Sequence, residues 1–111
     1  MTYNTQMSTK NQPYGLPEFE KEFGPYTFAK LIESYRLGED MSQTQFSKFL
    51  GISQASLCDL EKGRRIPSPT RAAAIAKKLK EPASFWIQLA MQDQLNAAGL
   101  DFKVSISSIE A

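Results

Sequence analysis

The segment from residue 42 to residue 62 constrains the fold most, because it holds two short helical patterns with almost no room between them. Ser42 can accept a hydrogen bond from the first turn of the first helix, and Gln45 completes a capping box. Gly51 ends this helix, and Ser53 can cap the next one immediately afterwards. Two short helices joined by a tight, glycine-containing turn are typical of helix-turn-helix geometry.

The second of these helices has a narrow apolar face. Its large apolar residues are Ile52, which we expect to fill the corner of the turn, and Leu57 and Leu60, which we expect to hold the helix against the rest of the domain. The outward positions are then Gln54, Ala55, Ser56 and Asp59. We infer that this polar side contacts another molecule.

Helical periodicity continues on both sides of the pair. Before it, residues 27–38 carry apolar side chains at spacings of three and four. After it, Ser68 and Pro69 open a helix in the N-cap and first positions, and a last helix runs from about Pro82 to Gly99. We therefore predict an all-α fold, a compact five-helix bundle.

Beyond Gly99 the apolar period changes from helical to two. Apolar residues alternate with polar ones at Leu100, Phe102, Val104 and Ile106. This pattern predicts a short C-terminal β-strand. No other segment offers a partner strand, so another molecule would have to pair with it. The alternative is a frayed tail in which the alternation is chance.

The chain divides into three predicted parts. Residues 1–26 are polar and proline-containing with scattered aromatic residues, which predicts a partly flexible N-terminal arm. Residues 27–81 form the helix-turn-helix domain. Residues 82–111 form a C-terminal helix and strand for dimerisation or partner binding, and we expect no additional catalytic or effector domain.

Composition excludes several classes of protein. The sequence has no histidine and one cysteine, Cys58, which rules out an intrachain disulfide and most zinc sites. It shows no phosphate-binding glycine loop and no nucleophile motif, so we expect no enzyme activity, no metal and no cofactor. Without a membrane-length apolar run or the apolar core of a signal peptide, the sequence predicts a cytoplasmic protein. Cys58 is expected to be a half-buried filler.

The charge distribution favours an anionic partner. The net charge of the whole chain is only +1, yet residues 27–80 hold ten Lys and Arg against five acidic residues. Both ends of the chain are mildly acidic. A basic middle segment is typical of proteins that bind nucleic acid.

The run M-S-Q-T-Q-F-S-K-F-L-G-I-S-Q-A-S-L-C-D-L-E-K-G-R-R-I-P-S resembles the DNA-binding domain of the phage repressor and Cro group, the Xre family. The resemblance covers residues from about 28 to 80. It implies a five-helix bundle like that of lambda repressor, whose third helix enters the major groove of DNA.

Roles follow from this resemblance position by position. The base-contacting residues would be Gln54, Ala55, Ser56, Asp59 and Gln43. The phosphate-contacting residues would be Ser53, Lys62, Arg64, Arg65 and Thr44. Asp59 departs from expectation, because a carboxylate is repelled by phosphates; it either sets specificity or lies off the contact surface. Arg36 and Glu61 would form a structural ion pair.

The resemblance also implies partners. Members commonly bind palindromic double-stranded DNA as homodimers, and the expected dimer residues are Trp86, Leu89, Phe102, Val104 and Ile106, although Trp86 could belong to the core. The contexts that fit are a phage Cro-like repressor, a restriction–modification controller and a HigA-like antitoxin that represses its own operon and binds a toxin protein. We favour the antitoxin. A protein-interaction module with weak DNA binding is the alternative from another class.

Overall fold

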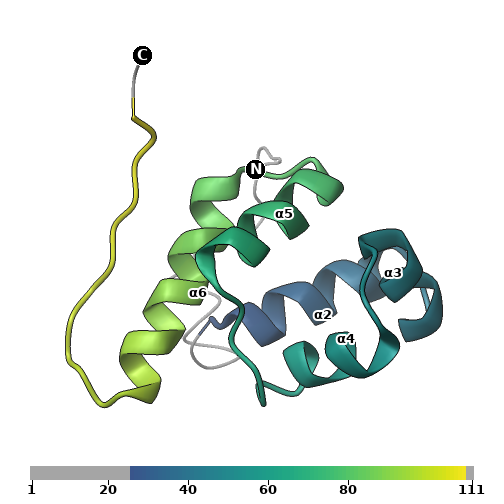
Figure 1. The fold of residues 1–111 in the computed structure, drawn as a ribbon, viewed down its shortest axis with the longest axis horizontal. Helices are drawn as coiled ribbons and strands as arrows, with labels where there is room; N and C mark the ends of the chain where they lie inside the picture. Colours follow the sequence, from purple (N-terminus) through teal and green to yellow (C-terminus); the bar gives the residue numbers. More distant parts are fainter. Residues whose placement is uncertain (1–25, 110–111) are drawn as a thin grey trace, which may run out of the picture.

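A computed structural model describes residues 26–109, and four of the five helices in this part of the chain begin where the sequence supplies a side-chain cap (Figure 1). The helices are α2 (Phe28–Gly38), α3 (Gln43–Leu50), α4 (Gln54–Glu61), α5 (Pro69–Leu79) and α6 (Ala83–Ala97). In the first four of them the N-cap side chain accepts a hydrogen bond from the backbone N–H three residues on, and these caps are Thr27, Ser42, Ser53 and Ser68. The predicted N-terminal arm lies almost entirely outside the described residues.

One hydrophobic core joins all five helices of the described segment. Its largest fully buried side chains are Trp86, Phe28, Phe46, Ile32, Leu57 and Leu60. Helix α5 packs along α6, while α2 contacts both α4 and α6 and α3 contacts α4 and α5. Figure 1 shows the resulting arrangement, with α3 and α4 at one side of the molecule and α6 at the other. None of the described helices is long and apolar enough to cross a membrane.

The connection between α2 and α3 turns through an aspartate. Gly38 is the last helical residue, and the left-handed residue of the turn is Asp40, with φ of 61°. A short polar side chain tolerates this conformation better than a branched one does, so aspartate can occupy this position.

The structure does not show the predicted C-terminal β-strand among the described residues. Residues 100–109 are extended, but the described residues contain no strand (Figure 1). Instead, the backbone of Phe102, Val104 and Ile106 is hydrogen-bonded to side chains of α6. The alternation of apolar residues therefore reflects docking along a helix, because Val104 and Ile106 are half-buried while their neighbours are exposed.

Candidate nucleic-acid interface

Helices α3 and α4 form a helix-turn-helix through a left-handed glycine. Gly51 has φ of 76°, and the N–H of Ile52 donates to the carbonyl of Ser47 at 3.0 Å. A Cβ at Gly51 would meet no atom within 4 Å, so the turn needs glycine for its backbone conformation and not for space. Ile52 packs on the core, and Ser53 then caps α4. The turn thus aims the N-terminus of α4 outward.

The outer side of α4 is polar, as its narrow apolar face predicts. Leu57 and Leu60 are buried. Gln54 and Ala55 are exposed, and Ser56 is half-buried beside the cap. The Ser53 hydroxyl accepts from the N–H of Ser56 and donates to its hydroxyl, so this side chain is occupied by the cap and is less available to a phosphate than predicted.

Gln54 is held by the preceding helix. Thr44 on α3 donates its hydroxyl hydrogen to Oε1 of Gln54 at 3.1 Å, and both residues are exposed. The amide nitrogen of Gln54 keeps its two donors, and Oε1 keeps one lone pair. An amide with a free donor and acceptor can pair bidentately with adenine, so Gln54 keeps the groups that its predicted base contact needs. Thr44 orients this amide, and its hydroxyl is engaged there instead of being free for the predicted phosphate contact.

Behind this surface lies a buried polar cluster. Arg36 on α2 donates from Nε to Glu61 Oε2 at 2.7 Å and from Nη2 to Oε1 at 3.1 Å, and it also donates to the carbonyl of Met41. Gln43 donates to Glu61 Oε1 at 2.9 Å. The hydrogen bond to Glu61 raises the pKa of Arg36. The structure therefore contains the predicted ion pair and directs Gln43 toward it, where the prediction had Gln43 on a base.

Asp59 lies against the basic loop that follows α4, which carries Lys62, Arg64 and Arg65. Its Oδ1 accepts from Nε of Arg64 at 3.0 Å, and its backbone carbonyl accepts from the N–H of Arg64 at 2.9 Å. Nη2 of Arg64 also contacts the sulfur of Cys58 at 3.5 Å. The hydrogen bond to Asp59 raises the pKa of Arg64. Asp59 thus fixes Arg64 and offsets its charge, which favours an organising role over base contact.

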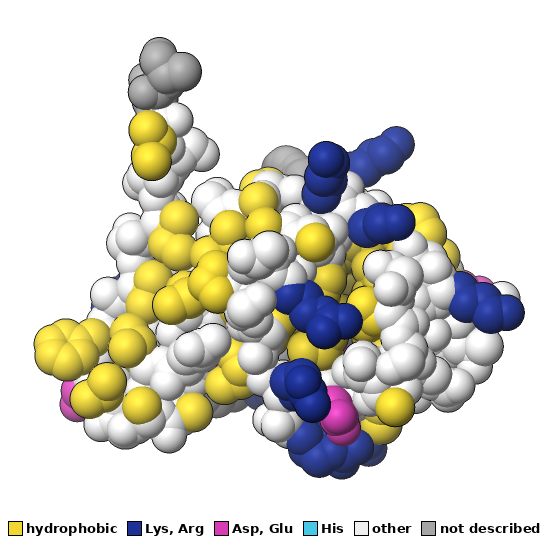
Figure 2. All heavy atoms as spheres, viewed as in Figure 1, with side chains coloured by type: hydrophobic (Ala, Val, Ile, Leu, Met, Phe, Trp, Pro, Cys, Tyr) yellow, Lys and Arg dark blue, Asp and Glu magenta, His cyan; other side chains and the backbone are white. Residues whose placement is uncertain are grey.

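Lys62 and Arg65 remain as exposed cations of this loop, and no ion pair joins either of them to a described residue. Figure 2 shows Lys and Arg side chains gathered over the part of the molecule that holds α3, α4 and α5. Hydrophobic side chains dominate the part that holds α6 and the extended tail. The polar outer face of α4 lies on this basic side of the molecule.

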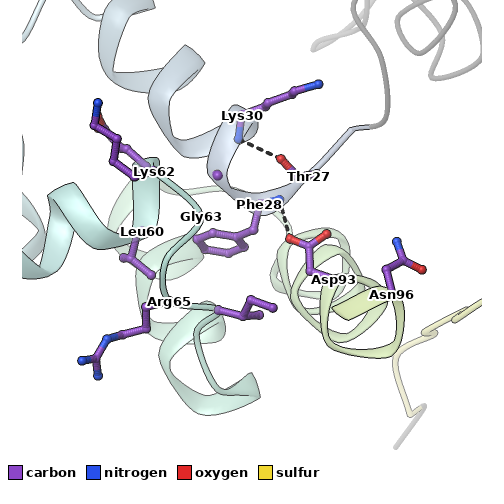
Figure 3. Close-up of a pocket in the computed structure, with 12 residues that line it drawn as sticks. Thr27, Phe28, Lys30, Leu60, Lys62, Gly63, Arg65, Asp93 and Asn96 are labelled. Atoms are coloured by element: carbon purple, nitrogen blue, oxygen red, sulfur yellow. Dashed lines mark hydrogen bonds between the residues drawn. The ribbon is translucent and has the colours of Figure 1, made fainter. Parts of the chain in front are cut away.

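A hollow of about 450 Å³ lies behind the basic loop, between the first turn of α2 and the C-terminal half of α6 (Figure 3). At its wall, the carboxylate of Asp93 accepts from the N–H of Phe28 at 2.9 Å, so α6 supplies a second cap to α2. Burial raises the pKa of Asp93, and this hydrogen bond opposes the rise. Labelled side chains of Lys62 and Arg65 point away from the hollow.

The half-buried position of Asp93 could have been predicted from the sequence. Trp86, Leu89, Ala90 and Asp93 recur at helical spacing, and the first three are buried. A carboxylate on the buried face of a helix needs a donor.

Two of the predicted dimer residues lie inside the protein. Trp86 and Leu89 are buried in the core of the protomer, away from any surface on which a second copy could pack, whereas Phe102 is 68% exposed.

Residues 32–86 match the family model described as helix-turn-helix (HTH_3). The matched segment spans α3, the turn, α4 and α5 and includes most of α2. It confirms the predicted Xre-like helix-turn-helix and supports a DNA-binding transcription regulator. No curated protein and no solved structure matches the chain.

Proposed function

We propose that this protein is a repressor that binds a palindromic operator as a homodimer and regulates its own operon. The observation that carries the proposal is the exposed amide of Gln54, oriented by Thr44 at the start of α4, together with the exposed cations Lys62 and Arg65 beyond the C-terminal end of the same helix. The amide supplies base discrimination, and the cations supply affinity for phosphates.

The test is a binding titration of the full chain against the DNA immediately upstream of its own gene. A random duplex of equal length serves as competitor, and the titration is repeated from about 50 to 200 mM salt. An autoregulator prefers the upstream DNA at least about a thousandfold and loses affinity linearly on a log–log plot against salt. Equal binding to both duplexes would overturn the proposal.

Within this function we favour an antitoxin of a toxin–antitoxin pair. The support is the run L-A-M-Q-D-Q-L-N-A-A-G-L-D-F-K-V-S-I, which resembles the tails of small Xre-type antitoxins. Further support comes from the exposed Leu100, Phe102 and Ile109 of the extended residues 100–109. Co-expression with each neighbouring gene tests the idea. A neighbour that arrests growth alone and is neutralised by this chain is expected, and harmless neighbours on both sides would exclude the role.

A protein-interaction module is the second candidate, and one observation favours it. Asp59 offsets the charge of Arg64 next to the proposed phosphate-contacting cations, which weakens attraction to DNA. Such a module would bind DNA weakly, with little preference between the two duplexes in the titration above. That result would direct the search to protein partners of the tail.

A further inference from the structure

The extended tail, residues 100–109, is held on one edge by two glutamines of α6. Gln92 donates from its amide to the carbonyl of Phe102 at 2.8 Å and accepts from the N–H of Val104 at 2.8 Å. Gln88, one helical turn earlier, accepts from the N–H of Ile106 at 3.0 Å. The tail therefore runs antiparallel to α6 along the face that carries these glutamines (Figure 1).

The Gln92 amide reproduces the hydrogen bonding of a neighbouring strand. In a parallel sheet, one residue donates to the carbonyl before its counterpart and accepts from the N–H after it, and Gln92 does this around Lys103. Phe102, Val104 and Ile106 thus direct backbone groups toward α6. In an extended chain the backbone N–H and C=O groups of successive residues point to opposite edges. The backbone groups of Lys103, Ser105 and Ser107 therefore point away from α6, where no described residue pairs with them.

We propose that this free edge pairs antiparallel with the same segment of a second copy of the chain, with the two-fold axis at Ser105. Gln88 and Gln92 are positioning residues that hold the segment extended before the second copy arrives. The inference rests on the proposed homodimer and assigns its surface. In such pairing, a strand is added to an exposed edge, and main-chain hydrogen bonds supply most of the contact.

The register follows from charge and side-chain pairing. With Ser105 opposite the partner's Ser105, Lys103 lies opposite the partner's Ser107, and every free backbone group from 103 to 107 finds a counterpart. Val104 then lies opposite the partner's Ile106, a favourable pair of β-branched residues. Centring on Lys103 would instead set two lysines opposite each other, and centring on Ser107 would oppose Val104 to the partner's Glu110.

Disulfide formation tests this register directly. In a Cys58→Ser background, Ser105→Cys places two thiols on residues whose Cα atoms lie about 5.5 Å apart, within the span of a disulfide. Ser107→Cys is the matched control, because the same register separates its two Cα atoms by more than about 10 Å. We expect oxidation to yield covalent dimers of the first variant at least about tenfold faster than of the second.

Sedimentation of the unmodified chain at the same concentration separates the two levels of the proposal. A dimer whose Ser105→Cys variant does not cross-link, or cross-links no faster than Ser107→Cys, would overturn the tail surface and leave the proposed dimer standing. A monomer at every concentration used would overturn both.

The positioning role has its own test. The double variant Gln88→Ala, Gln92→Ala is expected to weaken dimerisation about tenfold or more, because an unheld tail must be ordered on pairing. Gln94→Ala, on the same helix but bonded to the carbonyl of Pro67, is the control and should leave dimerisation unchanged. Amide hydrogen exchange at Val104 and Ile106 should be faster in the monomeric form of the double variant than in the wild type, and Gln94→Ala should leave it unchanged. Unchanged exchange and unchanged dimerisation would overturn the assignment.

Discussion

Arg36 and Glu61 form a bidentate ion pair, with 2.7 Å between Nε and Oε2, that joins α2 to the C-terminal end of α4. Their side chains are only 12% and 2% exposed. Because α4 carries the polar outer face, this pair fixes how that face is presented relative to the core. A buried pair of this kind orients more than it stabilises, yet losing one partner leaves a charge unpaired.

Replacing Arg36 with Met keeps an apolar stem and leaves the Glu61 carboxylate without its cation. We expect the free energy of unfolding to fall by about 3–5 kcal/mol, measured by urea denaturation. Ser34→Ala, exposed on the same helix and uncharged, should change it by less than about 0.5 kcal/mol. Equal losses in the two variants would show that the pair does not hold α4 in place.

Replacing Gln54 with Ala should erode preference at one base pair by about 1–3 kcal/mol and leave random DNA binding nearly unchanged. Thr44→Val should cause a smaller loss at the same base pair, because valine cannot donate to Gln54 Oε1. Competition with single-substitution operators measures both effects, with the exposed Thr70→Val as control. A loss spread evenly over all sequences would contradict base contact by Gln54.

Replacing Arg65 with Ala should weaken binding to every sequence to the same extent. It should also reduce the slope of log affinity against log salt by about 0.9, the value for one phosphate. Arg65→Lys retains the charge and should restore the slope. If the slope stays unchanged in the alanine variant, Arg65 does not contact a phosphate.

Replacing Asp59 with Asn removes a negative charge but keeps an acceptor for Arg64. We expect binding to random duplex to tighten by about fivefold at low salt, since unit charges a few ångströms apart interact by about 1 kcal/mol in water. The gain should vanish at high salt. Loss of affinity confined to one base pair would instead mean that Asp59 contacts a base.

Asp93 should make stability depend on pH in a defined direction. Burial raises its pKa in the folded chain above 3.8, so the folded state binds this proton more tightly than the unfolded state. Its contribution is therefore fully present below pH 3.8 and is lost as the pH rises through the folded pKa. Asp93→Asn keeps an acceptor for Phe28 but does not titrate. The unfolding free energy of the wild type minus that of Asp93→Asn should therefore fall as the pH rises through that window. A pH-independent difference would contradict the shift.

The sequence by itself determined where α3, α4 and α5 begin and where the turn between α3 and α4 lies. Ser42, Ser53 and Ser68 each bond a backbone N–H three residues away, and Gly51 supplies the left-handed residue. These interactions are local, so residue type and spacing predict them. The helix-turn-helix inferred from them is confirmed by the match over residues 32–86.

Only the tertiary structure decided which polar groups meet across the chain. Arg64 neutralises Asp59, Asp93 caps α2 from α6, and Gln88 and Gln92 hold the tail that periodicity alone had predicted as a strand. A period of two reports that alternate residues are buried, but it does not say whether a strand or a helix covers them. Hydrogen bonds between residues far apart in the sequence depend on how the helices pack, and no short stretch of sequence encodes that packing.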